Sequence, residues 1–432
     1  MSQGFERDRG EFARGARAIV VLPDQGSASR DAEARLEETA GLALAIGVEV
    51  VGKVQLRVRQ PKPATLIGSG QVEQLATQVR LDEAQLVVFD AALTPVQQRN
   101  LETALEAKVI DRTGLILEIF GERAATAEGR LQVELAHLDY QAGRLVRSWT
   151  HLERQRGGFG FLGGPGETQI EADRRLIRDR MARLRRELEQ VSRTRGLHRD
   201  RRQRAPWPVI ALVGYTNAGK STLFNRLTGA TVMAEDLLFA TLDPTLRQIS
   251  LPGIDKAILS DTVGFVSDLP TQLVAAFKAT LEEVVSADLL IHVRDVAHPD
   301  TEAQRFDVET VLTELGVGES TPRFEAWNKL DLLDVERRDE AGTEAARRDD
   351  VVAISALTGE GVDDLLRQVA AKLTADHRRY RIELDPADGA GAAWLHAHGE
   401  VLEQAVENSR TVYDVRLAPA DYNRFTQRQT AT

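Results

Sequence analysis

The residues with the clearest chemical meaning form a glycine-rich loop between a predicted strand and a predicted helix. Residues 214–221 fit the pattern G-x-x-x-x-G-K-[S/T], in which glycine backbones wrap a phosphate group. The apolar run at residues 209–213 is typical of a buried parallel strand, and residues 222–227 have helical spacing. A helix N-terminus adds backbone N–H groups and a positive dipole end. The predicted phosphate contacts are Gly214, Tyr215, Thr216, Asn217, Ala218, Gly219, Lys220, Ser221 and Thr222.

Side chains in and after this loop predict a Mg²⁺–phosphate site. Lys220 would reach the β- and γ-phosphates, and the Ser221 hydroxyl would bind Mg²⁺. A second predicted strand, at residues 258–264, ends in D-x-x-G. Its aspartate would hold Mg²⁺ through water, and its glycine N–H would contact the γ-phosphate. The predicted contacts of this segment are Asp261, Thr262, Val263 and Gly264.

The motif N-K-x-D at residues 328–331 predicts the base that is bound. A carboxylate pairs with the N1–H and N2–H₂ groups of guanine, which are both donors, whereas adenine offers no such pair. Asp331 therefore favours GTP over ATP. A further strand at residues 352–357 ends in Ser-Ala, where a backbone N–H would meet the guanine carbonyl oxygen. The predicted base contacts are Asn328, Lys329, Asp331, Ser355, Ala356 and Leu357.

The segment F-A-T-L-D-P-T between the phosphate loop and D-x-x-G is predicted to form the first switch. A threonine there can bind Mg²⁺ through its hydroxyl and the γ-phosphate through its N–H. Thr241 is the first choice for this role and Thr245 is the alternative. The predicted nucleotide contacts of the segment are Phe239, Ala240, Thr241, Leu242 and Asp243.

No residue is assigned as the catalytic group for hydrolysis. Hydrolysis requires a group that orients the attacking water, and Phe265 stands where many GTPases carry glutamine. We therefore expect slow hydrolysis by the chain alone, with a partner or K⁺ completing the site. Asn217 resembles the phosphate-loop asparagine that binds K⁺ in several potassium-stimulated GTPases. The alternative is that its side chain bonds to the loop backbone.

The composition indicates a soluble chain with several domains. Its 432 residues suffice for about two to four domains, and 42% of them are hydrophobic. No apolar run approaches the ~18–20 residues of a membrane span, and the charged first residues lack an apolar signal region. The absence of cysteine excludes disulfides and thiolate metal sites. We expect a cytoplasmic protein that can also associate peripherally with ribosomes or a membrane.

The first part of the chain predicts a disordered tail followed by a β/α domain. Residues 1–17 are polar, and residues 18–120 alternate short apolar runs with helical stretches, as in a mostly parallel sheet. I-G-S-G at residues 67–70 precedes a helix, where it forms either an anion site or a turn capped by Ser69. The predicted strands span residues 18–22, 48–58, 85–89 and 108–110, and the predicted helices span residues 31–46, 69–80 and 94–107.

Residues 121–206 predict a helical hairpin arm. Two sets of apolar residues with 4-3-4-3 spacing indicate two helices of matching length: Leu131, Leu135, Leu138, Ala142 and Leu145, then Ile177, Met181, Leu184, Leu188 and Val191. Between them lies a glycine-rich tip.

The tip combines aromatic and basic residues, and residues 121–207 carry 19 Lys/Arg against 12 Asp/Glu in a chain of net charge −11. Such a tip suits unpaired or folded RNA, through stacking and phosphate contact. The alternative is that its aromatic residues fold back onto the hairpin. The candidate RNA contacts are Arg154, Arg156, Gly157, Gly158, Phe159, Phe161, Arg174 and Arg175.

The fold class that follows is multidomain α/β. A P-loop GTPase domain with a doubly wound, mainly parallel sheet is expected at residues 207–375, after the N-terminal β/α domain and its arm. A small C-terminal α/β unit is expected at residues 376–432, with a strand at 380–384, a helix at 391–407 and a strand at 412–417 in β-α-β order.

The order of these parts and their motifs resembles HflX, a family of bacterial GTPases. The motifs that carry the resemblance are G-Y-T-N-A-G-K-S, F-A-T-L-D-P-T, D-T-V-G-F and N-K-L-D, with R-N-L-E at 99–102, V-I-D-R-T at 109–113 and G-P-G-E-T-Q at 164–169. They cover most of residues 18–375, and the C-terminal unit matches less well. The tip departs from the family pattern: Glu153 stands in place of a serine, and Phe161-Leu162-Gly163 replaces a Thr-Arg part.

The resemblance implies a GTPase that binds the large ribosomal subunit and splits stalled ribosomes under stress, with the arm directed toward the peptidyl-transferase region. It implies GTP as substrate, Mg²⁺ on Ser221 and Thr241, ribosomal RNA as a partner, stimulation by the ribosome, and ATP binding in the N-terminal region. We expect no DNA partner, and we expect a monomer because the heptads already pair within the chain. The alternatives are a nucleotide-gated RNA or ribosome scaffold with little hydrolysis, and an ATP-driven RNA remodeller, against which Asp331 argues.

Overall fold

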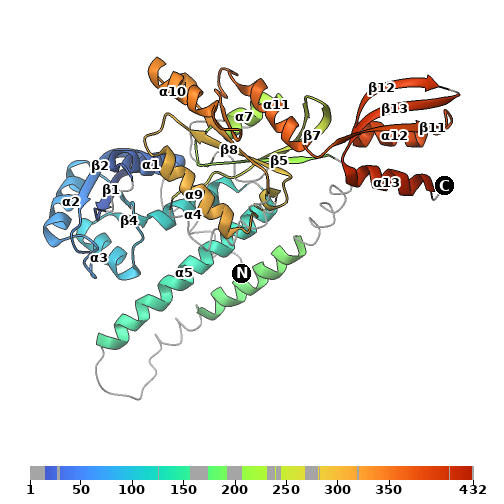
Figure 1. Ribbon diagram of the computed structural model, residues 1–432. Helices are drawn as coiled ribbons and strands as arrows, with labels where there is room; N and C mark the ends of the chain where they lie inside the picture. Colours follow the sequence, from blue (N-terminus) through green and yellow to red (C-terminus); the bar gives the residue numbers. More distant parts are fainter. Residues whose placement is uncertain are drawn as a thin grey trace.

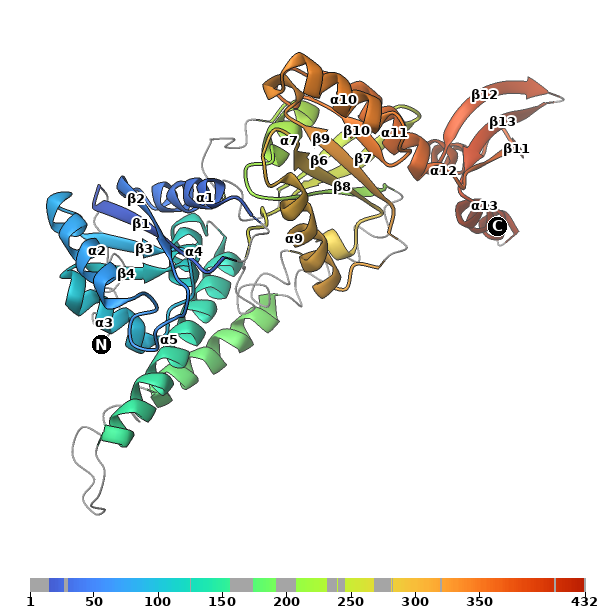
Figure 2. The ribbon, with the colours of Figure 1, turned by 60° about the vertical axis from the view of Figure 1, so that its left-hand side comes forward.

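The computed structural model describes residues 15–26, 30–124, 126–155, 174–191, 207–230, 239, 245–267, 281, 283–318, 321–407 and 409–430, with the backbone alone for 145–155 and 430. Figure 1 shows an N-terminal domain, a central domain and a C-terminal unit, with a helical arm that projects from the N-terminal domain. Figure 2 shows the C-terminal unit at the opposite end of the molecule from the N-terminal domain.

The N-terminal domain is a four-stranded parallel sheet with helices on both faces. Its strands β1 (Arg17–Asp24), β2 (Glu49–Arg57), β3 (Leu86–Phe89) and β4 (Lys108–Asp111) lie in the order β2-β1-β3-β4. The helices α1 (Ala32–Ala45) and α4 (Arg112–Arg123) pack on one face, and α2 (Ser69–Leu81) and α3 (Pro95–Leu105) pack on the other. The predicted parallel β/α domain is therefore confirmed.

Three expectations for this domain need correction. Gly15–Arg17 do not belong to a tail, because Gly15 N–H donates to Gly47 O (2.8 Å), Ala16 is buried and Arg17 begins β1. Ser69 does not cap α2: the N-cap is Gly68, whose N–H is accepted by the Gln71 side chain (2.9 Å). The helix α4 had no counterpart in the sequence analysis.

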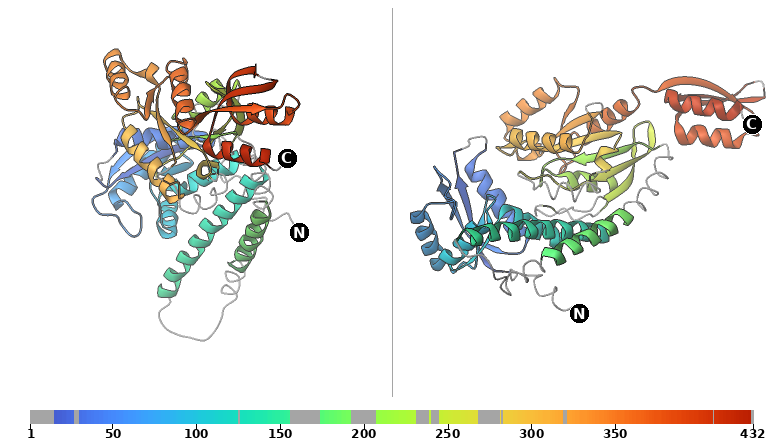
Figure 3. Two further views of the ribbon diagram at one scale, coloured as in Figure 1. Left: turned by 45° about the vertical axis from the view of Figure 1, so that its right-hand side comes forward. Right: turned by 90° about the horizontal axis from the view of Figure 1, so that it is seen from below.

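The arm is an antiparallel pair of helices, as the heptad spacing predicts. It consists of α5 (Ala127–Gln155) and a helix over residues 174–191. Leu138, Met181 and Leu184 form the buried seam, flanked by Leu131, Leu135 and Ile177. Figure 3 shows the two helices lying side by side and projecting away from the body of the molecule.

Asp111, at the end of β4, fixes the arm to the N-terminal domain. Its buried carboxylate caps α4 through Gly114 N–H (2.8 Å) and accepts from Leu93 N–H (3.0 Å). It also accepts from the Tyr140 hydroxyl (2.6 Å) and the Arg144 guanidinium (2.8 Å), both on α5. Burial, followed by the charge of Asp111, raises the pKa of Tyr140 above its ordinary value, so this phenol stays a hydrogen-bond donor.

The central domain has six strands, β5 (Val209–Val213), β6 (Thr245–Leu251), β7 (Ile254–Asp261), β8 (Leu289–Asp295), β9 (Arg323–Asn328) and β10 (Val351–Ala353), in the order β10-β9-β8-β5-β7-β6. All neighbours are parallel except β6 and β7. The helices α7 (Lys220–Thr228) and α11 (Val362–Leu373) pack on one face, and α9 (Thr301–Glu314) packs on the other; α10 (Val335–Ala345) precedes β10. The predicted doubly wound sheet is confirmed.

A hydrophobic cluster continues from the N-terminal domain into the central domain. It contains α4 residues such as Ile116 and Phe120 together with Tyr215, Phe239 and Phe265. The rings of Phe120 and Phe239 meet edge to face, with centroids 4.7 Å apart. Apolar side chains of the two domains are therefore buried against each other.

The C-terminal unit differs from the predicted β-α-β order. Its elements are β11 (Arg378–Leu384), α12 (Gly389–His398), β12 (Glu400–Glu407), β13 (Arg410–Leu417) and α13 (Pro419–Thr430), and its sheet has the antiparallel order β11-β13-β12. The helix predicted at 391–407 ends at His398. Residues 400–407 are strand because they pair along β13, and this pairing overrides the helix propensity of Glu, Leu, Gln and Ala.

We predict that Asp111→Ala destabilises the N-terminal domain by about 3 kcal/mol, because it leaves several buried donors without an acceptor. Urea unfolding and hydrogen exchange of β4 and α5 measure the effect. The matched control is Asp349→Ala, which removes an exposed carboxylate and should change the free energy of unfolding by less than about 0.5 kcal/mol. Equal effects of the two substitutions would contradict the assigned role of Asp111.

Candidate functional site

The phosphate loop lies between β5 and α7. At two of its positions, the backbone angle and the close neighbours favour glycine. Gly214 has φ +150° and Gly219 has φ +95°, and both values disfavour residues with a side chain. A Cβ on Gly214 would collide with the carbonyl oxygen of Val293 in β8, and one on Gly219 would collide with the side-chain amide of Asn328. The loop is therefore pressed against two neighbouring strand ends.

Lys220 and Ser221 open α7 with their functional groups in the loop. The Lys220 ammonium donates to Gly214 O (3.0 Å) and Tyr215 O (2.7 Å). Burial lowers the pKa of Lys220 to about 8, although the carboxylate of Asp261 opposes the shift. The Ser221 hydroxyl donates to Asp261 Oδ2 (2.7 Å), so the two residues expected to serve Mg²⁺ lie in contact.

The residues present fit a nucleotide phosphate and Mg²⁺. The Thr216 hydroxyl is buried in the loop and has no hydrogen-bond partner among the described residues, so a phosphate oxygen would satisfy it. Within the described part of the chain no cluster of His, Asp or Glu could hold a metal alone. Proteins usually bind Mg²⁺ through one or two side chains together with substrate phosphates, and Ser221 and Asp261 are such a pair of side chains.

The base-recognition motif connects three loops. Asn328, at the end of β9, donates from Nδ2 to Ala218 O and accepts at Oδ1 from Ala356 N–H, both at 2.8 Å. The Ser355 hydroxyl donates to Asp331 Oδ1 (2.6 Å) and so orients this carboxylate. Lys329 forms an ion pair with Asp295 at 2.7 Å. The side chains predicted to select guanine are therefore held in place by their neighbours.

The D-x-x-G segment lies directly against the phosphate loop. A Cβ on Gly264 would be 2.9 Å from Thr216 Cα and 3.1 Å from Lys220 Nζ. Phe265 pairs with the loop through its backbone: its N–H donates to Gly214 O (3.1 Å) and its carbonyl accepts from Thr216 N–H (2.7 Å). Its ring is only 1% exposed and belongs to the hydrophobic cluster between the domains. The ring therefore does not face the phosphate side of the loop as a water-binding group would.

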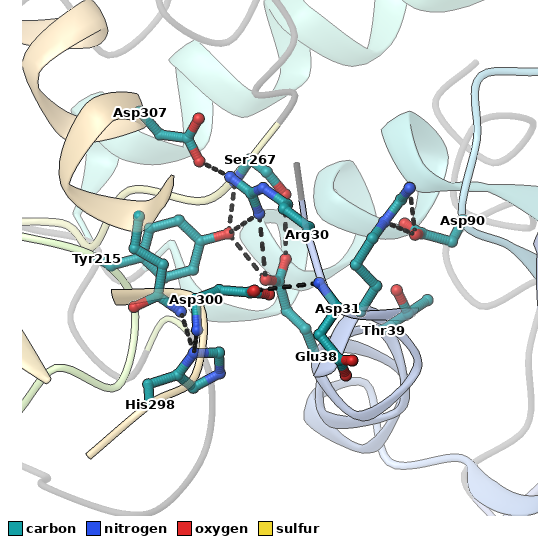
Figure 4. A network of polar contacts seen from close by, with 12 residues as sticks. Arg30, Asp31, Glu38, Thr39, Asp90, Tyr215, Ser267, His298, Asp300 and Asp307 are labelled. Atoms are coloured by element: carbon teal, nitrogen blue, oxygen red, sulfur yellow. Dashed lines mark hydrogen bonds and ion pairs between the residues drawn. The ribbon is translucent and has the colours of Figure 1, made fainter. Parts of the chain in front are cut away.

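A polar network joins the phosphate loop and the D-x-x-G segment to the N-terminal domain (Figure 4). The Tyr215 hydroxyl donates to Glu38 (2.8 Å) and accepts from Ser267 N–H (2.8 Å) and Arg30 (3.3 Å). Arg112, the first residue of α4, donates to Ser267 Oγ (2.7 Å), to Ser267 O (3.3 Å) and to Glu38. Burial raises the pKa of Tyr215 to about 12 and keeps its proton available for donation.

Arg112 is the central cation of this network. Its guanidinium also donates to Asp90 Oδ1 (2.6 Å), a carboxylate that is fully buried at the end of β3. Burial alone would lower the pKa of Arg112, but the neighbouring carboxylates of Glu38 and Asp90 raise it above its ordinary value. The residue therefore stays charged inside the interface.

Comparison with known proteins places these parts in one family. Four family models match in order: GTP-binding GTPase N-terminal at residues 33–121, GTP-binding GTPase Middle Region at 123–202, 50S ribosome-binding GTPase at 209–329 and HflX C-terminal domain at 341–430. The chain is 53% identical to GTPase HflX of Magnetococcus marinus over 95% of this chain and 94% of that protein.

This chain belongs to the HflX family of GTPases. It is also 44% identical to GTPase HflX of Escherichia coli over 92% of both chains. The solved structure of a GTP-binding protein from the archaeon Sulfolobus solfataricus in complex with GDP aligns with 83% of this chain and 99% of that chain, at 24% identity and a TM-score of 0.45.

In this HflX-family chain the predicted phosphate and base contacts gather at the ends of β5, β7, β9 and β10. Thr262 uses its hydroxyl to bond Leu212 O (2.6 Å), so it holds β7 against β5. Asn217 has φ +59° and an exposed side chain without a hydrogen-bond partner among the described residues. Bonding of the Asn217 side chain to the loop backbone was the alternative to K⁺ binding. The described residues do not show this bond.

Parts of the predicted site fall outside the described residues. These are Ala240, Thr241, Leu242 and Asp243 of the first switch, and Arg156, Gly157, Gly158, Phe159 and Phe161 of the arm tip; Arg154 is described only as backbone of α5. Phe239 is buried against Phe120, and Thr245 lies in β6 opposite Asp261. Of the two arginines after the tip, Arg175 is exposed and Arg174 is half-buried.

Sequence reasoning missed the residues that connect the domains, chiefly Glu38 and Arg112. Arg112 was noted only as part of V-I-D-R-T. The signal that was available is a charged pair, Asp111-Arg112, directly after a buried strand, because charges at that position need partners within the fold.

No helix in the described ranges combines the length and the apolar character that a bilayer crossing requires.

We predict that Tyr215→Phe destabilises the chain by about 1–3 kcal/mol, since it removes the acceptor for the partly buried Ser267 N–H. Urea unfolding measures the cost, and amide exchange at Ser267 should become faster. Tyr380→Phe serves as the control, because the structure gives the Tyr380 hydroxyl no hydrogen-bond partner among the described residues. Unchanged exchange at Ser267 in Tyr215→Phe would show that the phenol does not hold this segment.

We predict that Asp331→Asn raises the Kd for GDP about 100-fold and strengthens binding of xanthosine diphosphate. The amide cannot accept from guanine N1–H and N2–H₂ as a carboxylate does, but it can donate to the C2 carbonyl of xanthine. Titration with fluorescent nucleotides measures both constants. Asp339→Asn makes the same exchange at an exposed position on α10 and should leave both unchanged. A variant that keeps its guanine preference would contradict the base assignment.

Proposed function

We propose that this chain binds the large ribosomal subunit, hydrolyses GTP to GDP and phosphate with Mg²⁺, and splits or rescues stalled ribosomes under stress. The match of residues 209–329 to a model described as 50S ribosome-binding GTPase supports the partner. We place this activity in the cytoplasm, with ribosomal RNA contacted by the arm.

The observation that carries the proposal is that Asp111 and Arg112 are adjacent and face different parts of the molecule. Arg112 bonds to Ser267, three residues beyond Gly264. Asp111 bonds to Tyr140 and Arg144 of the arm. A displacement of the D-x-x-G segment by the γ-phosphate therefore acts on the residue next to the one that holds the arm.

The γ-phosphate is expected to cause such a displacement. Its expected contacts are the N–H of Gly264 and the ammonium of Lys220, and Gly264 lies close to Thr216, since a Cβ on it would be 2.9 Å from Thr216 Cα. We infer that the γ-phosphate of GTP shifts Gly264 relative to Thr216, and that GDP, which lacks this group, does not. The arm can thereby distinguish the two nucleotides.

The residues of the site have separate expected roles in hydrolysis. Lys220 and the loop N–H groups hold the phosphates, and Ser221 with Asp261 would hold Mg²⁺, joined by Thr241. Bound Mg²⁺ neutralises charge on the phosphates. Because the ring of Phe265 is buried, we assign the orientation of the attacking water to a group outside this chain, supplied by the ribosome. We propose K⁺ beside Asn217 as a further contributor.

The buried ring of Phe265 also favours a second candidate, a nucleotide-gated scaffold that binds RNA or ribosomes and hardly hydrolyses GTP. The two candidates share the same nucleotide site and differ in the response of turnover to the partner.

We predict slow GTP turnover by the chain alone and at least about 100-fold stimulation by purified large ribosomal subunits, which supply the missing catalytic group in trans. Phosphate release in K⁺ buffer measures both rates, and small subunits serve as the control particle. Lack of stimulation with tight GTP binding intact would favour the scaffold. Equal rates in Na⁺ and K⁺ would remove the proposed role of K⁺ alone.

A further inference from the structure

Residues 355–359, in the loop after β10, contain one backbone N–H without a hydrogen-bond partner among the described residues. In residues 355–359, Ser355 N–H donates to Glu360 O, Gly359 N–H to Ser355 O (2.8 Å) and Ala356 N–H to Asn328 Oδ1. Thr358 N–H donates to Ser355 Oγ (3.1 Å). The Leu357 N–H has no hydrogen-bond partner within the described residues. Leu357 is an exposed residue, so its N–H is accessible to an external acceptor, while the other four N–H groups of this segment are used within the fold.

Arg226, on the last turn of α7, holds the peptide that carries this donor. Its Nε donates to Ala356 O (2.6 Å), and its Nη2 donates to Leu357 O. In a trans peptide the carbonyl and the N–H of the next residue point in opposite directions. Fixing Ala356 O toward α7 therefore points the Leu357 N–H away from α7 and fixes its direction.

The loop is shaped around the guanidinium of Arg226. Gly359 has φ +96°, and a Cβ there would lie 2.6 Å from Arg226 Nη1 and 3.2 Å from its Cζ. The backbone angle favours glycine at this position, and a larger residue would displace the guanidinium of Arg226. The planar fork of arginine can bond two carbonyls at once, which the single ammonium of lysine cannot do with the same geometry.

We propose that Arg226 is a positioning residue for the guanine base, and that it aims the Leu357 N–H at the O6 carbonyl of guanine. This inference rests on the proposed function, because it places guanine between Asp331 and this loop. Asp331 would accept from N1–H and N2–H₂ on one edge of the ring, and Leu357 would donate to O6 beside them. Arg226 itself does not touch the nucleotide.

The test compares GDP with 6-thio-GDP, in which sulfur, a weaker acceptor, replaces O6 and the other base groups are unchanged. The wild-type chain should bind GDP about tenfold more tightly than 6-thio-GDP, as expected for one hydrogen bond. In Arg226→Ala the Kd for GDP should rise about tenfold while the Kd for 6-thio-GDP hardly changes. The ratio of the two constants should therefore approach one. A substitution that only loosened the site would raise both constants together and keep the ratio.

Two further variants separate the effect of the guanidinium fork from effects of charge and of removing any arginine. Arg226→Lys keeps the charge but not the fork, so its ratio should fall between those of wild type and Arg226→Ala. Arg367→Ala removes an exposed arginine of α11 that bonds only to Asp364 in the described structure, and it should behave as wild type. A ratio in Arg226→Ala equal to that of wild type would overturn the proposal while leaving the guanine site intact. A wild-type chain that bound ADP as tightly as GDP would instead overturn the guanine site itself.

Discussion

The structure depends on a buried cation between two domains. Arg112 keeps its charge because Glu38 and Asp90 surround it, and it uses its remaining donors on Ser267 of the central domain. Removing one partner from such a buried group of charges lowers the free energy of unfolding by about 3–5 kcal/mol, because the remaining charge stays buried without its partner. The interface therefore has a defined polar geometry in addition to its shared apolar cluster, and Tyr215 extends that geometry into the phosphate loop.

The same interface accounts for a phenylalanine at position 265. A glutamine side chain there would need polar partners, whereas the phenyl ring is buried in the cluster that joins the domains. The backbone of Phe265 is meanwhile paired with Gly214 and Thr216. The position therefore contributes to domain packing and to loop pairing, which agrees with the proposal that a group from outside the chain orients the attacking water.

Much of this arrangement could be predicted from sequence, because strand-end motifs and helical periodicity are local signals. The phosphate loop, the D-x-x-G segment, Asn328 and Asp331 lie where their flanking apolar runs predict. The helix α4 was missed because Leu115, Ile116, Leu117, Ile119 and Phe120 form a nearly continuous apolar run instead of a stripe with helical spacing. Residues 400–407 were assigned wrongly because their antiparallel partner β13 follows later in the chain. The roles of Glu38, Arg112 and Arg226 depend on contacts distant in sequence, which no periodic pattern reports.

The helix α4 also connects two segments of the central domain. Its first residue, Arg112, bonds to Ser267 beyond the D-x-x-G segment, and Phe120, in its last turns, packs against Phe239 of the segment expected to form the first switch. The two contacts are separated by about 12 Å of continuous helix, at 1.5 Å per residue. A short α-helix behaves as a stiff rod, so a shift at one end changes the other. The two segments predicted to contact the nucleotide are thus attached to opposite ends of one helix and are expected to change state together, with α5 following in the chain.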